Sequence, residues 1–514
     1  MLRSVRIGIS LLVVLLFGLI FLGGEQASTF LAKPLSYVQF TPALAQWTLS
    51  AGGAAALGVL CILLLTLGFG RVYCACLCPL GIFQDGLLFL AGTLRRKTVY
   101  ALQPAYPFLR YGMLATTIAS FVLGSLALPN FLDPYSFAGR LMSQLFRPIV
   151  VFLNNLLAAL LEVFGVYALA SLPIPPLLWL PFSVTLLGFL LLAGMTIRRG
   201  RLYCNTLCPV GAILGMVSRF AFYKIALQQA ECINCGLCAQ KCRAGCIDVP
   251  HKTIDASRCV ACFDCLAICP KTALAYRRRM PQTKPEPIDP ARRKLLALTA
   301  SAAGTLMVAS LPLRSAFRPL LPAAAVAPVV PPGALSVAHF TATCTACYLC
   351  VNICPAQGIQ PALFAYGLRG VLQPTLDYKH GYCAYECNAC GRVCPTGAIT
   401  PLPLAEKKLT QIGQTKLIKD LCVVYAKKQE CGACVEVCPT HAVYTEERET
   451  ILYPETKVEH CTGCGRCELV CPVVPAKAIF VEARAVHASA SEPYYVSPPA
   501  RQAAPPSGSS DFPF

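Results

Sequence analysis

Twenty-four cysteines in three groups of eight limit the fold of this chain more than any other feature. The chain has 514 residues and 31 cysteines, most of them in tight runs spaced by two or three residues, and most runs end in Cys-Pro. A secreted disulfide framework does not need such spacing. Four thiolates that converge on one small inorganic core do need it. The spacing therefore predicts iron–sulfur clusters rather than disulfides or zinc.

Two runs of a two-cluster ferredoxin interleave: three cysteines of one run share a cluster with the fourth cysteine of the other. The first group, "CINCGLCAQKC" with "CVACFDCLAICP", predicts one cluster on Cys232, Cys235, Cys238 and Cys269, and another on Cys242, Cys259, Cys262 and Cys265. Arg243 replaces the usual proline after Cys242. Cys246 stands where a later run has Ala398, so it is not assigned as a ligand.

The second and third groups follow the same rule with small departures. The second group predicts ligand sets Cys344, Cys347, Cys350, Cys394 and Cys354, Cys383, Cys387, Cys390. The third begins with Cys422, eight residues before the next cysteine of its run, and predicts sets Cys422, Cys431, Cys434, Cys471 and Cys438, Cys461, Cys464, Cys467. Six [4Fe–4S] clusters in three α+β ferredoxin-like modules follow, at residues 225–280, 338–405 and 415–485.

The N-terminal residues 1–215 predict an α-helical membrane domain. Hydrophobic residues make up 56% of the chain, and four apolar runs, near 7–23, 49–69, 109–129 and 176–196, are long enough for a hydrocarbon core of about 30 Å. A fifth stretch, 149–171, is interpreted as re-entrant or interfacial. The net charge of +19 comes with arginines and lysines beside the apolar runs, which indicates positive-inside loops rather than nucleic-acid binding. The N-terminus and the first module are then cytoplasmic.

A repeat joins the membrane domain to the redox chemistry. "GRVYCACLCPLG" at 70–81 returns as "GRLYCNTLCPVG" at 200–211, each after an apolar run. The two copies supply four thiols on one membrane face: Cys74, Cys78, Cys204 and Cys208. Four thiolates are the number that a [4Fe–4S] cluster needs, so a shared seventh cluster is one hypothesis. A reactive dithiol pair and a docking role are the alternatives.

The first histidine is His251, so no bis-histidine haem lies in the membrane domain, and the sequence has no Cys-x-x-Cys-His, P-loop or dinucleotide fingerprint. Residues 290–318, with Arg292 and Arg293, predict an internal twin-arginine-like signal or a membrane segment that places the later modules outside. Residues 319–334 predict a Pro/Ala linker, and residues 487–514 a disordered tail.

These parts together resemble known families. The first 280 residues resemble the NapH family, which pairs four spans with two Cys-x3-Cys-Pro motifs and a cytoplasmic two-cluster ferredoxin. Residues 290 to about 485 resemble its exported partner, the NapG/MauM family, which has four clusters and one run with a distant first cysteine, matched here by Cys422. The chain resembles a fusion of the two.

The resemblance implies a quinol-dehydrogenase-type component of the bacterial inner membrane, with the last two modules in the periplasm. Its implied role is electron transfer from the quinol pool to a periplasmic cytochrome or reductase. The alternative is an assembly or activation factor that reduces a metal centre in a partner respiratory enzyme. The sequence marks no quinone pocket and no acceptor.

Overall fold

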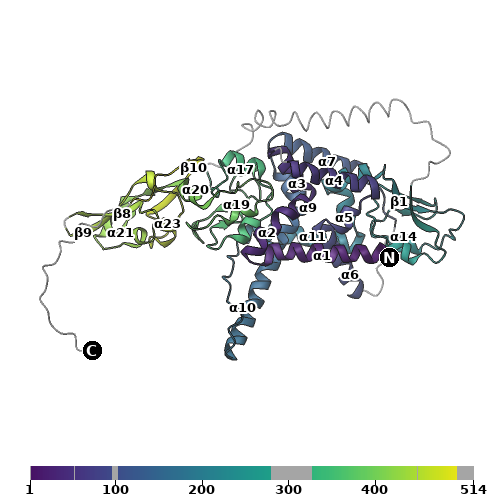
Figure 1. Ribbon diagram of the computed structural model, residues 1–514, viewed down its shortest axis with the longest axis horizontal. Coiled ribbons are helices and arrows are strands. Elements are labelled where there is room, and N and C mark those ends of the chain that lie inside the picture. The colour runs from purple at the N-terminus through teal and green to yellow at the C-terminus, as the bar shows by residue number, and fades with distance from the viewer. Residues whose placement is uncertain (1, 51–52, 95–101, 279–326, 449, 495–514) are drawn as a thin grey trace.

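A helical body lies between one small module at one end and two at the other (Figure 1). The computed structural model describes residues 2–50, 53–94, 102–278, 327–448 and 450–494. We call residues 223–278 the first module, residues 327–409 the second and residues 410–494 the third. The predicted signal segment, 290–318, lies outside the described residues.

The helical body contains thirteen α-helices within its described residues, and a π-helical turn, Met142–Phe146, lies between two of them. The helices are α1 Leu2–Leu22, α2 Glu25–Tyr37, α3 Phe40–Ser50, α4 Gly53–Phe69, α5 Val72–Cys76, α6 Pro79–Leu94, α7 Pro107–Val122, α8 Ala127–Leu132, α9 Pro134–Leu141, α10 Arg147–Val163, α11 Trp179–Arg199, α12 Leu202–Thr206 and α13 Pro209–Ser218.

Three helical stretches in the described part of the chain are long and apolar enough to cross a membrane: Leu2–Leu22, Pro134–Val163 and Trp179–Arg199. The first and last agree with predicted runs. Helices α4 and α7 take the place of the other two runs, but they have only 17 and 16 residues. Most of the stretch 149–171, interpreted above as re-entrant or interfacial, belongs to a longer helix, because α9, the π turn and α10 form one continuous helical stretch that is itself a candidate span. Helix α10 projects away from the body (Figure 1).

Two helical hairpins enter the body from the end that holds the second module. Helix α2 begins at Glu25, which pairs with Arg392 of the second module, and the turn before α3 contacts the first cysteine motif through Gln39 Nε2 and the Leu77 carbonyl (2.9 Å). Helices α8 and α9 likewise contact the second module and a cysteine motif. Leu126 N donates to the Arg369 carbonyl (3.4 Å), and the turn at Leu132 contacts the second cysteine motif. In both halves of the helical body a pair of short helices therefore connects the second module to a cysteine motif.

Each module consists of short helices and two-stranded antiparallel sheets. The first has β1 Tyr223–Leu227 paired with β4 Leu274–Arg278, β2 Ile247–Asp248 paired with β3 Thr253–Ile254, and helices α14 Leu237–Lys241 and α15 Asp264–Ile268. The second has α17 Val337–Thr343, α18 Leu349–Ile353, α19 Ala389–Val393, α20 Leu404–Leu409 and the pair β5 Ile359–Gln360 with β6 Thr375–Leu376.

The third module is the most strand-rich. It has β7 Thr410–Leu417 with β10 Ile479–Ser489, β8 Val443–Arg448 with β9 Ile451–Thr456, and helices α21 Val423–Lys427, α22 Ala433–Glu436 and α23 Arg466–Val470. Short 3₁₀ turns complete the second and third modules at Gly367–Arg369, Lys419–Leu421 and Val458–His460.

Two boundary predictions were wrong at their edges. The second half of the predicted linker packs in the core of the second module, where Val329, Val330 and Ala334 are buried. The predicted tail starts too early, because β10 continues to Ser489. In the linker, small apolar residues are buried although the composition resembles that of a loop.

Candidate functional site

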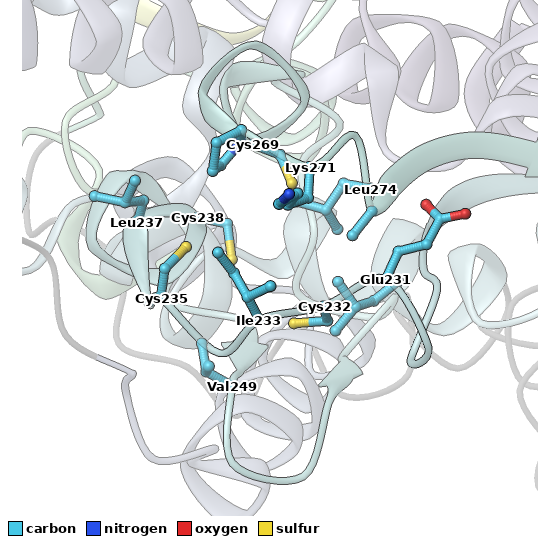
Figure 2. Close-up of a pocket in the computed structure, with 14 residues that line it drawn as sticks. Glu231, Cys232, Ile233, Cys235, Leu237, Cys238, Val249, Cys269, Lys271 and Leu274 are labelled. Carbon is cyan, nitrogen blue, oxygen red and sulfur yellow. The ribbon is translucent and has the colours of Figure 1, made fainter.

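The first predicted ligand set surrounds one pocket in the first module. Figure 2 shows Cys232, Cys238 and Cys269 directed into this pocket, with Cys235 beside them and apolar side chains around them. The runs on α14 and on the segment after α15 meet because the two halves of the module pack face to face. The interleaved arrangement expected from the spacing is thus present in the structure.

Three more pockets gather predicted sets. One in the first module is lined by Cys242, Cys259, Cys262 and Cys265, together with Cys246. Two in the third module are lined by the sets Cys422, Cys431, Cys434, Cys471 and Cys438, Cys461, Cys464, Cys467. Cys422 therefore lies with its predicted partners despite the eight-residue gap.

The second module brings its cysteines together in the same way. Cys350 interacts electrostatically with Cys344, Cys347 and Cys394. The other four thiols form a second group, in which Cys390 interacts with Cys354, Cys383 and Cys387. The two groups meet at Cys350 and Cys390. Both sets follow the interleaved pairing.

The donor chemistry of these pockets fits cluster binding. Burial raises the pKa of Cys262, Cys347 and Cys464 to about 12, so each thiol keeps its proton at neutral pH unless a cation compensates for the thiolate charge. In the described part of the chain, no three His, Cys, Asp or Glu side chains are grouped closely enough for a single metal ion. The thiols are instead spread around pockets, as a larger inorganic core requires.

The two copies of the membrane motif hold each other through their arginines. Arg71 Nη2 donates to the carbonyl of Cys204 (3.0 Å) and lies 3.8 Å from Cys74 Sγ. Arg201 Nη1 donates to the carbonyl of Cys74 (3.1 Å) and lies 3.9 Å from Cys204 Sγ. Both arginine side chains are fully buried. Each arginine therefore neutralises its own copy and ties it to the other.

The recurring glycines and prolines explain how the two motif copies can pack against each other. A side chain at Gly81 would collide with the Cys74 carbonyl and Arg201, and one at Gly211 would collide with the Cys204 carbonyl. The prolines after the second cysteines begin α6 and α13, where a missing N–H costs nothing. Cys208 caps α13 by accepting from Gly211 N (3.3 Å).

The recurring tyrosines connect each motif to a hairpin. Tyr73 Oη accepts from Phe40 N (3.1 Å) and donates to Gln39 Oε1 (3.0 Å), whereas Tyr203 Oη donates to the Leu132 carbonyl (2.8 Å). The four motif thiols are buried, and they interact electrostatically: Cys208 interacts with Cys204, Cys78 and Cys74. The structure thus gathers all four at one buried site, between the first module and the hairpins.

One contiguous buried core contains thiols of the first module, all four motif thiols and Cys347 of the second module. Arg71 bridges to the first module by donating to the Ser257 carbonyl (3.1 Å), two residues before Cys259. At the other end, Cys383 N donates to the Cys464 carbonyl (2.9 Å), which joins the second and third modules. The cysteine sites therefore follow one another through the molecule.

A carboxylate that the sequence analysis missed holds the first junction. Asp85 of α6 accepts from three arginines: Arg6 (3.1 Å), Arg201 (2.8 Å) and Arg243 (2.9 Å). Arg243 also pairs with Asp264 (2.8 Å), which explains why arginine replaces proline there. The isolated position of Asp85 in an apolar helix was the only signal for it in the sequence.

Two other cysteines stay outside the four-thiol groups. Cys61 is exposed on α4, and Cys76 is buried on α5 with Thr206 at its place in the second copy. Cys246, by contrast, lies inside a pocket although the sequence analysis had excluded it.

Comparison with known proteins agrees with this arrangement. Residues 343–399 and 429–474 match the 4Fe-4S dicluster domain, and residues 51–97 and 183–225 match the 4Fe-4S binding domain, which contains both membrane motifs. An uncharacterized protein of Methanocaldococcus jannaschii is 37% identical over 84 residues, which are 16% of this chain and 33% of that protein. The chain thus spans a third of that relative.

Two relatives are covered over most of their length. The ferredoxin-type protein NapF of Escherichia coli K12 is 28% identical over 154 residues, 30% of this chain and 85% of NapF. The methylamine utilization ferredoxin-type protein MauM of Methylorubrum extorquens is 32% identical over 195 residues, 36% of this chain and 86% of MauM. With its 4Fe-4S domains and its three candidate membrane-spanning helices, the chain belongs to the ferredoxin-type iron–sulfur electron-transfer proteins, the family of MauM.

Proposed function

We propose that this chain is a membrane-bound polyferredoxin that passes electrons from the quinol pool to a periplasmic acceptor, such as a c-type cytochrome or a reductase. The observation that carries the proposal is the continuous order of cysteine sites from the first module, through the membrane motifs, to the third module. A protein that only stored iron, or used one site, would not need this order. The NapH and NapG/MauM fusion is part of the proposal.

The distribution of charge supports an orientation in the bacterial inner membrane. Arg3 pairs with Asp264 of the first module (3.1 Å), and the buried Arg6 pairs with Asp85, so the basic N-terminus lies against that module. Basic residues favour the cytoplasmic side. The first module is then cytoplasmic, and the other two, at the opposite end of the helical body (Figure 1), are periplasmic.

Six [4Fe–4S] clusters on the module thiols, and a seventh on the motif thiols, supply one-electron carriers when bound. The work of the chain is to hold the thiols, exclude water and balance charge. Arg71 and Arg201 place two positive charges beside the four motif thiols at a site shielded from water, where electrostatic interactions are stronger than in bulk. They thereby stabilise negative charge on those sulfurs.

The test is reduction of the purified full-length protein in liposomes by a water-soluble quinol analogue. We expect bleaching of the broad thiolate–iron absorption near ~420 nm within catalytic turnover times, followed by recovery when an oxidised c-type cytochrome is added outside. Cys204→Ala should slow this recovery, and Cys61→Ala, a change of an exposed cysteine that lines none of the four pockets described above, should not. Reduction by quinol that is absent or much slower than turnover would contradict the proposal and favour the assembly-factor alternative.

A further inference from the structure

The second pocket of the first module holds five thiols rather than four. Cys246 lines it with Cys242, Cys259, Cys262 and Cys265. The other pockets described above hold four each. The extra thiol is buried, with 2% of its surface exposed, so it is not an adventitious surface cysteine.

Cys246 contacts two of the predicted ligands directly. Its Sγ lies 3.6 Å from Cys242 Sγ, and its thiol also interacts with the thiol of Cys259, which lines the same pocket. Cys242 and Cys259 come from the two different runs of the module. The sulfur of Cys246 therefore lies on the ligand side of the pocket, between the two runs.

The position of Cys246 in its run explains why it faces the pocket. It follows the fourth cysteine by four residues, as Ala273, Ala398 and Ala442 do in three other runs, and each of these alanines is buried. Ala273 lines the first pocket of the same module. A Cβ at this position thus points toward the ligands, and a cysteine there extends a sulfur toward them.

The segment that carries both thiols is anchored to the membrane domain. The Arg243 carbonyl accepts from Arg201 N (2.7 Å), and the Arg243 side chain pairs with Asp85 and Asp264. The Asn205 side chain donates to the Ala244 carbonyl (3.3 Å). The backbone between Cys242 and Cys246 is therefore held by contacts that do not depend on either thiol.

We propose that Cys246 is a stand-in ligand, which takes the place of Cys242 as the fourth thiolate beside Cys259, Cys262 and Cys265. The proposal rests on the proposed function insofar as the first module binds clusters. The exchange is a substitution without oxidation: one iron–sulfur bond breaks, another forms, and the thiol proton moves from Cys246 to Cys242. The site at the junction with the membrane domain then keeps a complete ligand set when Cys242 is lost or modified.

The test compares Cys242→Ala, Cys246→Ala and the double variant in the full-length protein. We expect both single variants to keep the iron and sulfide content of the wild type, and the double variant to lose iron and to show the electron paramagnetic resonance signal of a three-iron cluster or no cluster at that site. Iron loss in Cys242→Ala equal to that of the double variant would overturn the proposal. Iron loss in Cys246→Ala alone would also overturn it, because Cys246 would then be the resident ligand.

The third module provides the matched control. Cys438 is also a fourth cysteine, and Ala442 holds the place of Cys246. Cys438→Ala should lose iron, and Cys438→Ala with Ala442→Cys should regain it. A wild-type protein without iron would contradict the proposed function itself, whereas iron in the wild type that is lost in Cys242→Ala contradicts only the stand-in role.

Discussion

Replacing Asp85 by asparagine should loosen the first module from the membrane domain. Asp85 is the carboxylate shared by Arg6, Arg201 and Arg243, which come from three separate segments of the chain. Arg201 is fully buried, and Asp85 is its only carboxylate partner among the described residues. The change removes the negative charge and keeps the size of the side chain, so packing is little altered.

The expected cost follows from the buried guanidinium groups. Removing one partner of a buried ion pair destabilises a protein by about 3–5 kcal/mol, because an uncompensated charge stays in a medium of low polarity. The Asp264–Arg243 pair remains in the variant and limits the loss to this junction. Since about 1.4 kcal/mol corresponds to a factor of ten, the junction should open about 10²–10⁴ times more often.

Hydrogen–deuterium exchange of the backbone amide of Arg201 and of the amides in residues 223–278 measures this opening directly. Protection at the junction, for example of Arg201 N on the Arg243 carbonyl, should fall by that factor. Glu446→Gln is the control, because it removes a carboxylate from an exposed pair with Arg448, and such pairs contribute about 0–1 kcal/mol. If protection in Asp85→Asn stays within about threefold of the wild type, a difference of about 0.6 kcal/mol, the shared carboxylate does not hold the junction.

Three further changes test other parts of the molecule. Arg71→Gln should lower the reduction potential of a motif-bound cluster by about 100 mV in a redox titration. The reason is that a charge at about 4 Å contributes up to about 4 kcal/mol at an effective dielectric constant of about 20. An unchanged potential would show that the charge of Arg71 does not act on the motif thiols. Burial lowers the pKa of His487 to about 4. Between pH 6.5 and 4 the histidine is therefore protonated in the unfolded chain but neutral in the folded one. The free energy of unfolding falls as the pH falls through that window, by up to about 3 kcal/mol. His487→Gln should remove this part of the pH dependence of thermal unfolding, and an identical pH profile in the variant would refute it. Cys422→Ala should reduce iron per chain by part or all of one cluster, whereas Cys61→Ala should leave iron unchanged; equal iron in both would remove Cys422 from its ligand set.

The cysteine spacing predicted the grouping of thiols because ligand geometry is local. Two or three residues between cysteines leave few ways to converge on one core, so even the distant Cys422 falls with its set. The repeat likewise predicted four gathered motif thiols. What the sequence did not reveal was why glycine and arginine recur in it, since the Arg71–Cys204 contact joins residues more than 130 positions apart.

The features that were missed depend on tertiary packing. The turns between α2 and α3 and between α8 and α9 contact the cysteine motifs, and a hydropathy pattern does not show such contacts. Cys246 was set aside because a later run has Ala398 at its place, and a sequence pattern cannot show which way the side chain at that place points. Asp85 was missed because its three partners come together only in the folded chain.

The short hairpin α8–α9 explains how the second module comes close to the motif thiols. Tyr203 of the second motif contacts Leu132 at the turn, and a side chain at Gly139 would collide with the Cys347 carbonyl of the second module. Seven residues of helix rise about 10 Å, far less than the hydrocarbon core of about 30 Å. Tyr135 lies within this interval and packs against Phe17 of α1 (5.8 Å between ring centroids), so the interval is filled by side chains. The second module therefore comes close to the motif thiols because the α8–α9 hairpin is short. The helices on either side of the hairpin can be longer without increasing this separation.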